Sequence, residues 1–151
     1  MNHAVAVDAS VAIKWVLTAE VLSEQAEALL LDSLAARRPI LAAPHLPSEV
    51  SSALYQRTRT RGPLRHISEQ EAEEALDTFL SYPVQLVTGA DLYREAVLFA
   101  MAHRLPSIYD VLYIVAARIT DVELWTADQR LLNAVGSAAP WVRPIADYWS
   151  P

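Results

Sequence analysis

The sequence predicts an α/β protein, a three-layer α/β/α sandwich around a short, mostly parallel sheet. Short apolar runs alternate with longer amphipathic segments along the whole chain, and this alternation is typical of parallel strands joined by helical crossovers. No repeat, low-complexity segment or flexible linker divides the chain. Because 151 residues is an ordinary length for one unit, residues 1–151 are predicted to form a single domain.

The apolar runs give five candidate strands. The first run ends in a carboxylate, Asp8, and reads as a buried strand. Pro39 precedes the second run and Pro83 precedes the third, so each run is separated from the helix before it. The expected strands cover residues 3–8, 40–43, 84–87, 123–125 and 141–143.

The intervening segments are predicted to be helices. Ser23 is an N-cap candidate, and Ser68 with Glu71 three residues later forms a capping box. Gly62 followed by Pro63 is expected to end the third helix. The expected helices cover residues 9–17, 23–38, 44–60, 68–80, 91–103, 111–119 and 128–135.

Composition narrows the class of protein. A hydrophobic fraction of 53% and a charged fraction of 20% predict an ordered core, and the absence of cysteine excludes disulfides and zinc–thiolate sites. A net charge of −6 argues against a protein that coats nucleic acid by bulk electrostatics, but is compatible with an acidic site completed by a cation. Neither a membrane span nor a secretory signal is expected, so we expect a cytoplasmic protein.

Four acidic residues are placed where a ligand would bind. In open parallel sheets, ligands bind beyond the carboxyl ends of the strands. Asp8 ends the first strand, Asp128 follows the fourth, and Asp110 lies at the start of the apolar helix. Right-handed crossovers would bring these three to one edge of the sheet. Glu49 borders the apolar stripe of the third helix and can point into the same cleft.

Four converging carboxylates predict a metal site. Like charges raise one another's pKa, and Mg²⁺ or Mn²⁺, which prefer oxygen ligands, would remove that conflict. Such a site suits hydrolysis of a phosphodiester, in which one metal polarises the phosphate and activates water while a second can stabilise the leaving oxygen. The simpler alternative is that the aspartates are helix N-caps and that Glu49 is solvated. Capping and metal binding are compatible, and the joint placement favours the metal site.

Other polar residues have less specific interpretations. Ser10 and Thr126 each lie two residues from an acidic candidate, where a hydroxyl can orient a carboxylate or cap a turn. The four histidines show no ligand spacing, and Tyr109 and Tyr113 are expected to pack rather than to stack on bases. A cluster of arginines near Gly62 could contact the phosphates of a nucleic acid or bind an acidic partner, or could form a solvated helix end. The cluster comprises Arg57, Arg59, Arg61 and Arg65.

Several other functions are weighed against the nuclease reading. Three glycines are too few for a dinucleotide fingerprint or a phosphate-binding P-loop. A metal-dependent phosphatase of small phosphoesters stays open, although the haloacid-dehalogenase type needs a second aspartate where this chain has Ser10. A binding module without activity also stays open, and the intact acidic set argues against it.

Four segments together resemble a known family. Residues 7–15 (VDASVAIKW), 48–54 (SEVSSAL), 109–113 (YDVLY) and 126–131 (TADQRL) are similar to the four signature segments of PIN-domain proteins. They are most similar to the VapC toxins of bacterial and archaeal toxin–antitoxin pairs. Each segment has low specificity alone, but the four occur in the same order and span nearly the whole chain.

The resemblance implies a fold, an activity and partners. It implies a PIN-like sandwich and a Mg²⁺- or Mn²⁺-dependent endoribonuclease that cuts RNA, often tRNA or rRNA. Asp8, Glu49 and Asp110 would be direct metal ligands, and Asp128 would hold a second metal or a water on the first. Ser10 and Thr126 would support them. The resemblance also implies a homodimer and inhibition by a cognate VapB-type antitoxin; the alternative is a PIN-domain nuclease of RNA processing outside a toxin pair.

Overall fold

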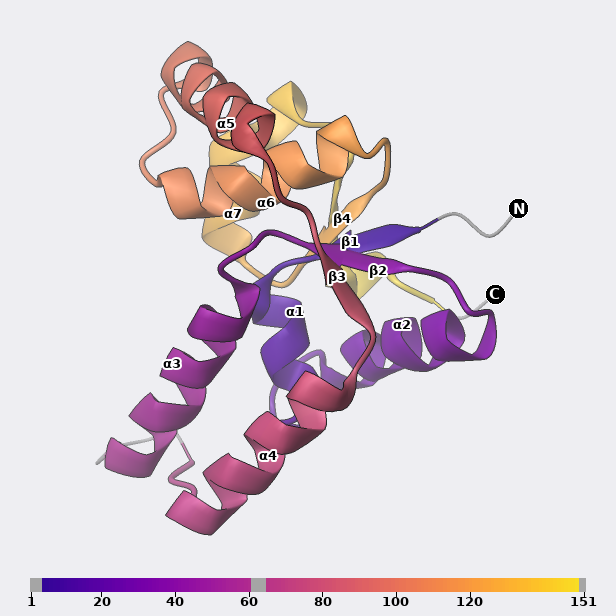
Figure 1. Cartoon of the computed structure of the whole chain (residues 1–151), viewed down its shortest axis with the longest axis vertical. Helices are drawn as coiled ribbons and strands as arrows, with labels where there is room; N and C mark the ends of the chain where they lie inside the picture. The colour runs from indigo at the N-terminus through magenta and orange to yellow at the C-terminus, as the bar shows by residue number, and fades with distance from the viewer. Residues whose placement is uncertain (1–3, 61–64, 150–151) are drawn as a thin grey trace.

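The computed structural model describes residues 4–60 and 65–149, and a five-stranded sheet lies at its centre (Figure 1). The strand order is β3-β2-β1-β4-β5, and every neighbouring pair is parallel. This sheet confirms the predicted α/β class. The strands are β1 (Val5–Val7), β2 (Ile40–Ala42), β3 (Val84–Leu86), β4 (Leu124–Thr126) and β5 (Val142–Pro144).

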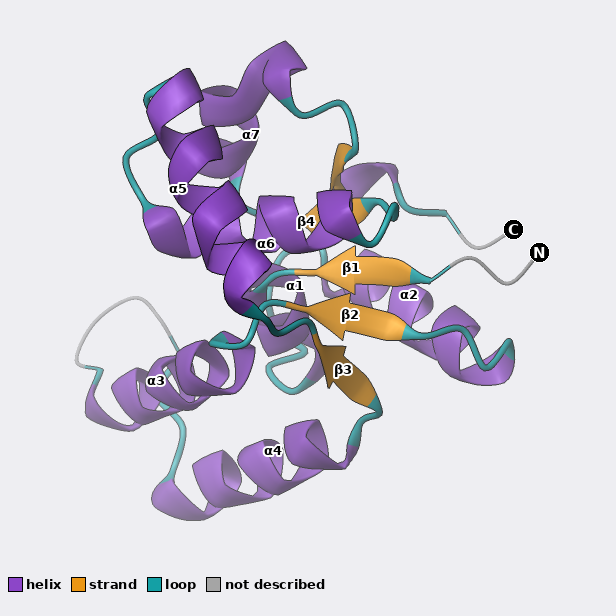
Figure 2. Cartoon of the chain, turned by 45° about the horizontal axis from the view of Figure 1, so that its top comes forward, coloured by secondary structure: helices purple, strands orange, loops and turns teal. Residues whose placement is uncertain are grey.

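Helices cover both faces of this sheet, which gives the three layers (Figure 2). Helices α5, α6 and α7 lie on one face and α1 and α2 on the other, while α3 and α4 pack side by side and extend away from the β3 edge (Figures 1 and 2). The helices are α1 (Ala9–Ala12), α2 (Ser23–Ala35), α3 (Leu46–Arg59), α4 (Glu69–Ser81), α5 (Ala90–His103), α6 (Ile108–Ile119) and α7 (Gln129–Val135).

The strand order places a topological switch point at one edge of the sheet, and we call the space beyond it the crevice. The chain leaves β1 towards β2 on one side, whereas β4 lies on the other side and leads to β5. The carboxyl ends of β1 and β4 therefore flank the point where the direction of winding reverses, which is where doubly wound sheets bind ligands. We call this side of the molecule the carboxyl edge, and the opposite side the amino edge.

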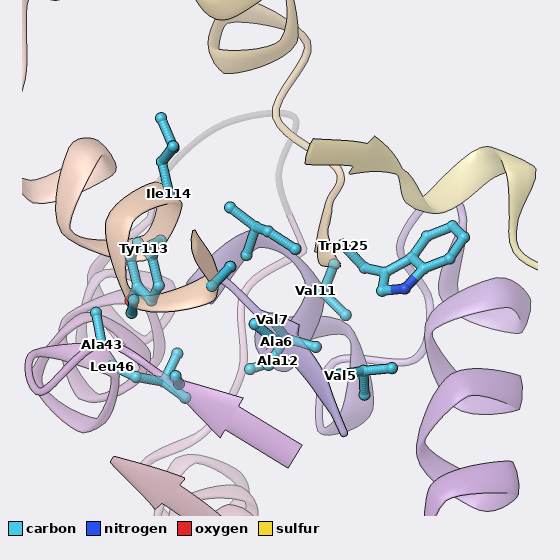
Figure 3. Packing of buried hydrophobic residues seen from close by; sticks show 14 of the residues in the cluster. Val5, Ala6, Val7, Val11, Ala12, Ala43, Leu46, Tyr113, Ile114 and Trp125 are labelled. Carbon is cyan, nitrogen blue, oxygen red and sulfur yellow. The ribbon is translucent and has the colours of Figure 1, made fainter. Parts of the chain in front are cut away.

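Burial in the core explains why the strands appear in the sequence as apolar runs. All three residues of β1 are buried, as is the continuous stretch 111–117 of α6 that packs on β1, β2 and β4. Figure 3 shows these side chains gathered around β1, with Ile114 and Tyr113 from α6 and Leu46 from α3. Burying one large aliphatic side chain contributes about 1.5–3 kcal/mol, so α6 is held in place chiefly by its buried faces.

Helix starts agree with the sequence in some places and differ in others. Asp8 and Asp128 cap α1 and α7, and Ser68 forms the expected capping box with Glu71. The prediction of Ser23 as an N-cap was wrong: its hydroxyl donates to the carbonyl of Glu20, so it is the first helical residue.

Two other helices differ in length from the prediction. The helix expected over 9–17 is a single α-turn, α1, followed by a 3₁₀ turn at Ile13–Trp15. The apolar helix begins earlier than residue 111, because the Ser107 hydroxyl accepts from the backbone N–H of Asp110 and caps α6. Asp110 is thus the third residue of that helix and not its cap.

The helices were also compared with the length of a membrane span. Within residues 4–60 and 65–149, no helix combines the length and the apolar character that crossing a bilayer requires.

Candidate active site at the carboxyl edge

Asp8 is the buried centre of the candidate site. It follows β1 directly, caps α1 and is only 5% exposed. Its Oδ1 accepts from the Ser10 hydroxyl at 2.5 Å and from the backbone N–H of Val11 at 3.2 Å. Its Oδ2 accepts from the hydroxyl of Thr126, the last residue of β4. Asp8 therefore joins the carboxyl ends of the two strands that flank the crevice.

The two hydroxyls belong to one network that fixes Asp8. The Ser10 Oγ accepts from the backbone N–H of Ala127 at 2.8 Å, and the Thr126 Oγ1 accepts from that of Asp128 at 3.0 Å. Because both oxygens accept from the backbone after β4, both hydroxyl protons are directed to the Asp8 carboxylate. Sequence reasoning placed Ser10 and Thr126 beside the acidic residues, and the structure gives them this orienting contact.

Asp8 carries an uncompensated electrostatic cost. Burial raises its pKa to about 6, against the lowering by the hydrogen bonds from Ser10, Thr126 and Val11, and the charge of Asp128 raises it further. The contacts that lower it come from hydroxyl and backbone N–H groups. A positive charge near Asp8 would favour its ionised form.

Asp128 lies across the crevice at the start of α7. Its Oδ1 accepts from the backbone N–H groups of Arg130 at 2.9 Å and Leu131 at 3.3 Å, so it is an N-cap as the simpler interpretation proposed. Its charge also raises the pKa of Asp110. Capping occupies one carboxylate oxygen and leaves Oδ2 without a hydrogen bond from the described residues.

Asp110 completes the same face of the crevice from α6. Partial burial raises its pKa first, and the charges of Asp128 and Glu49 raise it further, while Arg130 lowers it. Asp110 thus lies close enough to Asp128 and to Glu49 for each of these carboxylates to repel it. The structure therefore brings Asp8, Glu49, Asp110 and Asp128 to one edge, as the sequence predicted from their positions.

Glu49 is held by Tyr113 and lies beside His45, two contacts that sequence reasoning did not assign. The Tyr113 hydroxyl donates to Glu49 Oε2, and His45 Nε2 lies 3.6 Å from the same oxygen. The His45 and Tyr113 rings are in contact, with centroids 4.6 Å apart. Burial raises the pKa of Tyr113, and its hydrogen bond to Glu49 raises it further, so Tyr113 remains a proton donor. The i, i+4 spacing of His45 and Glu49 was the available signal.

The donor set suits a hard divalent cation, although the side chains do not form a closed ligand group. All four candidates offer carboxylate oxygens, the ligands that Mg²⁺ and Mn²⁺ prefer, and their mutual repulsion would be relieved by a cation. Within residues 4–60 and 65–149, no three acidic, histidine or cysteine side chains are grouped closely enough to hold one ion. Asp8 and Glu49 each accept hydrogen bonds from within the chain. The site therefore suits a cation through the chemistry of its four carboxylates and through their position at one edge.

Three of the arginines near Gly62 make contacts within the chain. Arg57 pairs with Glu20 and its side chain is only 14% exposed, while Arg59 lies over the Tyr55 ring at the far end of α3 from Glu49. Arg65 lies near Glu71, at 3.7 Å. Arg61 falls outside the described residues. Their contacts with RNA or with an antitoxin stay a prediction.

Arg130 is a cation beside the acidic edge that the sequence analysis did not single out. The Arg130 Nε lies 3.8 Å from Asp128 Oδ1, and its side chain is 96% exposed. The signal in the sequence was its place two residues after Asp128, in the first turn of α7.

Tyrosines at the same edge divide into two kinds. Tyr113 is 2% exposed and packs, as predicted, whereas Tyr109 is 62% exposed, contrary to the expectation that it packs. The difference follows from α6 itself, since Tyr109 lies in the first turn and off the buried face that contains Tyr113.

No protein-family model matches the chain, and no curated protein sequence matches it.

Proposed function

We propose that this chain is a Mg²⁺- or Mn²⁺-dependent endoribonuclease whose active site is the acidic carboxyl edge. One observation carries the proposal: a buried Asp8 follows the central strand, the charge of Asp128 raises the pKa of both Asp8 and Asp110, and the charge of Glu49 also raises the pKa of Asp110. The repulsion between these carboxylates costs stability in the free protein, which makes the arrangement a candidate for ligand binding.

Each residue has a role that its contacts support. Ser10 and Thr126 orient Asp8, and Tyr113 orients Glu49, so these two carboxylates are held in fixed directions. Asp8, Glu49 and Asp110 would hold the cation, and Asp128 would hold a second ion or a water at its free oxygen. A bound divalent ion supplies positive charge that stabilises the phosphate in the transition state.

The substrate and the partners follow from the resemblance to PIN-domain proteins. We propose a cytoplasmic toxin of a toxin–antitoxin pair that cuts tRNA or rRNA, forms a homodimer and is inhibited by a VapB-type antitoxin. Unpaired loops are the favoured targets, because their backbone can be drawn into a crevice. A PIN-domain nuclease of RNA processing would share the same site and lack the antitoxin.

Cleavage of RNA tests the catalytic proposal directly. Wild-type protein and the Asp8→Asn variant are incubated with total RNA in Mg²⁺, in Mn²⁺ and in a chelator, and the 5′ ends of the products are sequenced. We expect metal-dependent cuts by the wild type and a loss of at least about 10³-fold in rate in Asp8→Asn, because the orienting network then holds an uncharged group. Asp32→Asn, which removes a carboxylate bonded to Tyr148, is the matched control and should cut normally.

Other outcomes would identify the alternatives. Wild-type cleavage by Asp8→Asn would contradict the site. Hydrolysis of an aryl phosphate without any cleavage of RNA would favour a phosphatase, and RNA binding without cleavage in either metal would favour a binding module.

Metal binding has a readout that does not depend on activity. Mg²⁺ that binds only the native state should raise the melting temperature of the wild type. Asp110→Ala should blunt this rise, whereas Asp121→Ala, at the other end of α6, should not. Equal rises in all three proteins would place the ion elsewhere.

The toxin assignment needs a cellular test. Expression of the wild type alone should arrest growth, and co-expression with the adjacent gene product should restore it. Growth arrest that no neighbouring gene relieves would favour the RNA-processing alternative.

A further inference from the structure

A small pocket opens beside the acidic residues, between the start of α6 and α7. Its volume is about 250 Å³. One side carries Asp110, Asp128 and Ser107, and apolar groups that include Leu105, Leu131 and Ala134 form the rest. This volume is just below the range of about 300–1,000 Å³ that complete small-molecule sites occupy, so the pocket suits one ring system.

Arg130 gives this pocket a positive charge. It lines the pocket, and its guanidinium contributes to the electrostatic environment of both Asp128, at 3.8 Å, and Asp110. Its side chain is almost fully solvated, so its hydrogen-bond donors are free to meet a ligand. Guanidinium groups bind phosphate oxygens through paired hydrogen bonds.

We propose that this pocket receives the nucleotide next to the phosphate that is cut, with its base or ribose against the apolar wall and its own phosphate on Arg130. The inference rests on the proposed nuclease function, because that function places the reacting phosphate at Asp110 and Asp128. An apolar wall, an acidic side and one exposed guanidinium match the three chemical parts of a nucleotide in an RNA chain, whose base, sugar and phosphate lie in fixed order.

The charge contact is tested by binding in the Asp8→Asn background, where the probe stays intact. Fluorescein-labelled single-stranded RNA is titrated in Mg²⁺ and followed by anisotropy. We expect Arg130→Ala to weaken binding about 10-fold, the usual effect of losing a charged hydrogen bond. The slope of log affinity against log salt should become shallower by about 0.7, as for one lost phosphate contact on a single strand.

The matched control is an arginine that lies beside an acidic residue elsewhere in the molecule. Arg143 on β5 lies 3.9 Å from Glu123, much as Arg130 lies 3.8 Å from Asp128. Arg143→Ala removes the same charge from the protein but lies outside the pocket, so its affinity should stay within about 2-fold of the background protein. An equal loss in both variants would show a general effect of net charge and would overturn the proposal.

The apolar wall is tested by filling the pocket. Ala134 is an exposed residue of α7, so Ala134→Phe places a ring in the pocket without disturbing the core. We expect weaker binding by about 10-fold and a changed order of affinity among homopolymeric RNA probes, because the base can no longer enter. Ala35→Phe, an exposed helical alanine at the end of α2, is the matched control and should change neither.

Failure of this inference is distinct from failure of the nuclease proposal. If the wild type cuts RNA but Arg130→Ala and Ala134→Phe bind and cut as their controls do, the pocket is not the nucleotide subsite. If RNA is bound through Arg130 and Ala134 but never cut, the subsite stands and the nuclease proposal fails.

Discussion

Charged side chains have different surroundings at the two edges of the parallel sheet. At the amino edge, several charged groups meet a partner: Arg38 donates to Tyr148, whose hydroxyl donates to Asp32, and Arg118 pairs with Glu95 at 2.8 Å. At the carboxyl edge, Asp8 is fixed by hydroxyl and amide donors, and its pKa is raised by burial and by Asp128.

This difference separates structural charges from candidate functional ones. Paired charges need nothing further, and their removal leaves a partner unsatisfied. Converging carboxylates cost stability in the free protein and gain it only when a cation arrives. The carboxyl edge should therefore respond to pH, to metal and to neutral substitutions in ways that the amino edge does not.

The largest expected effect is a change in pH dependence in Asp8→Asn. Burial raises the folded-state pKa of Asp8 from 3.8 to about 6. Its stabilising contribution is thus full below about pH 4 and is lost as the pH rises through about 6, a change of roughly 3 kcal/mol in the free energy of unfolding. Asp8→Asn lacks this loss, so relative to the wild type it should gain stability as the pH rises. Urea denaturation in a chelator measures the difference.

The same experiment can contradict this prediction. Unfolding curves for the wild type and Asp8→Asn that stay parallel from about pH 4 to pH 7 would mean that Asp8 is not penalised by burial. If the two curves do diverge, added Mg²⁺ near neutral pH should reduce the difference in the free energy of unfolding between the two proteins, because only the wild type has the Asp8 carboxylate.

A smaller effect is expected for the hydroxyl that joins the two central strands. Thr126→Val keeps the shape of the side chain but removes the donor to Asp8 and the acceptor for the Asp128 N–H. Because the site is buried, we expect a loss of about 2 kcal/mol in the free energy of unfolding.

The amino edge offers the control for this change. Thr120 at the end of α6 donates to the carbonyl of Ala116 at 2.7 Å, and Thr120→Val should cost less than about 1 kcal/mol because that carbonyl keeps a backbone partner. Equal losses in the two variants would show that Thr126 has no special place in the network.

The fold could be predicted from sequence because its signals are local. Short apolar runs predicted all five strands, two of them after a proline, and Ser68 with Glu71 predicted the start of α4. Two helix starts were predicted wrongly, each at a place where a serine hydroxyl decides which residue caps the helix. Ser23 bonds to a carbonyl in the preceding turn, and Ser107 caps α6 in front of Asp110, so composition alone could not decide which residue caps.

Part of the candidate site could also be predicted from the sequence, and part could not. Three aspartates and Glu49 could be placed from strand ends and a helical wheel, because their positions follow from topology. The partners of Glu49 could not be placed, because Tyr113 lies 64 residues away on a helix that crosses over β1 and β2. His45 was missed for a related reason: its spacing to Glu49 gains meaning only once Tyr113 is known to face both.

The smallest effect distinguishes orientation from stability. Tyr113→Phe removes the donor to Glu49 Oε2 and leaves the ring against His45, so Glu49 can turn away from the crevice. Tyr148→Phe at the amino edge removes a hydroxyl that accepts from Arg38 at 3.0 Å and donates to Asp32 at 2.9 Å. Each variant should lose about 1 kcal/mol in the free energy of unfolding. Only Tyr113→Phe should weaken the binding of Mn²⁺, by about 10-fold in calorimetric titration, because loss of an orienting partner lowers metal affinity. Unchanged Mn²⁺ affinity in Tyr113→Phe, with the expected loss of stability, would make Tyr113 a structural residue and leave Glu49 free to reach the cation unaided.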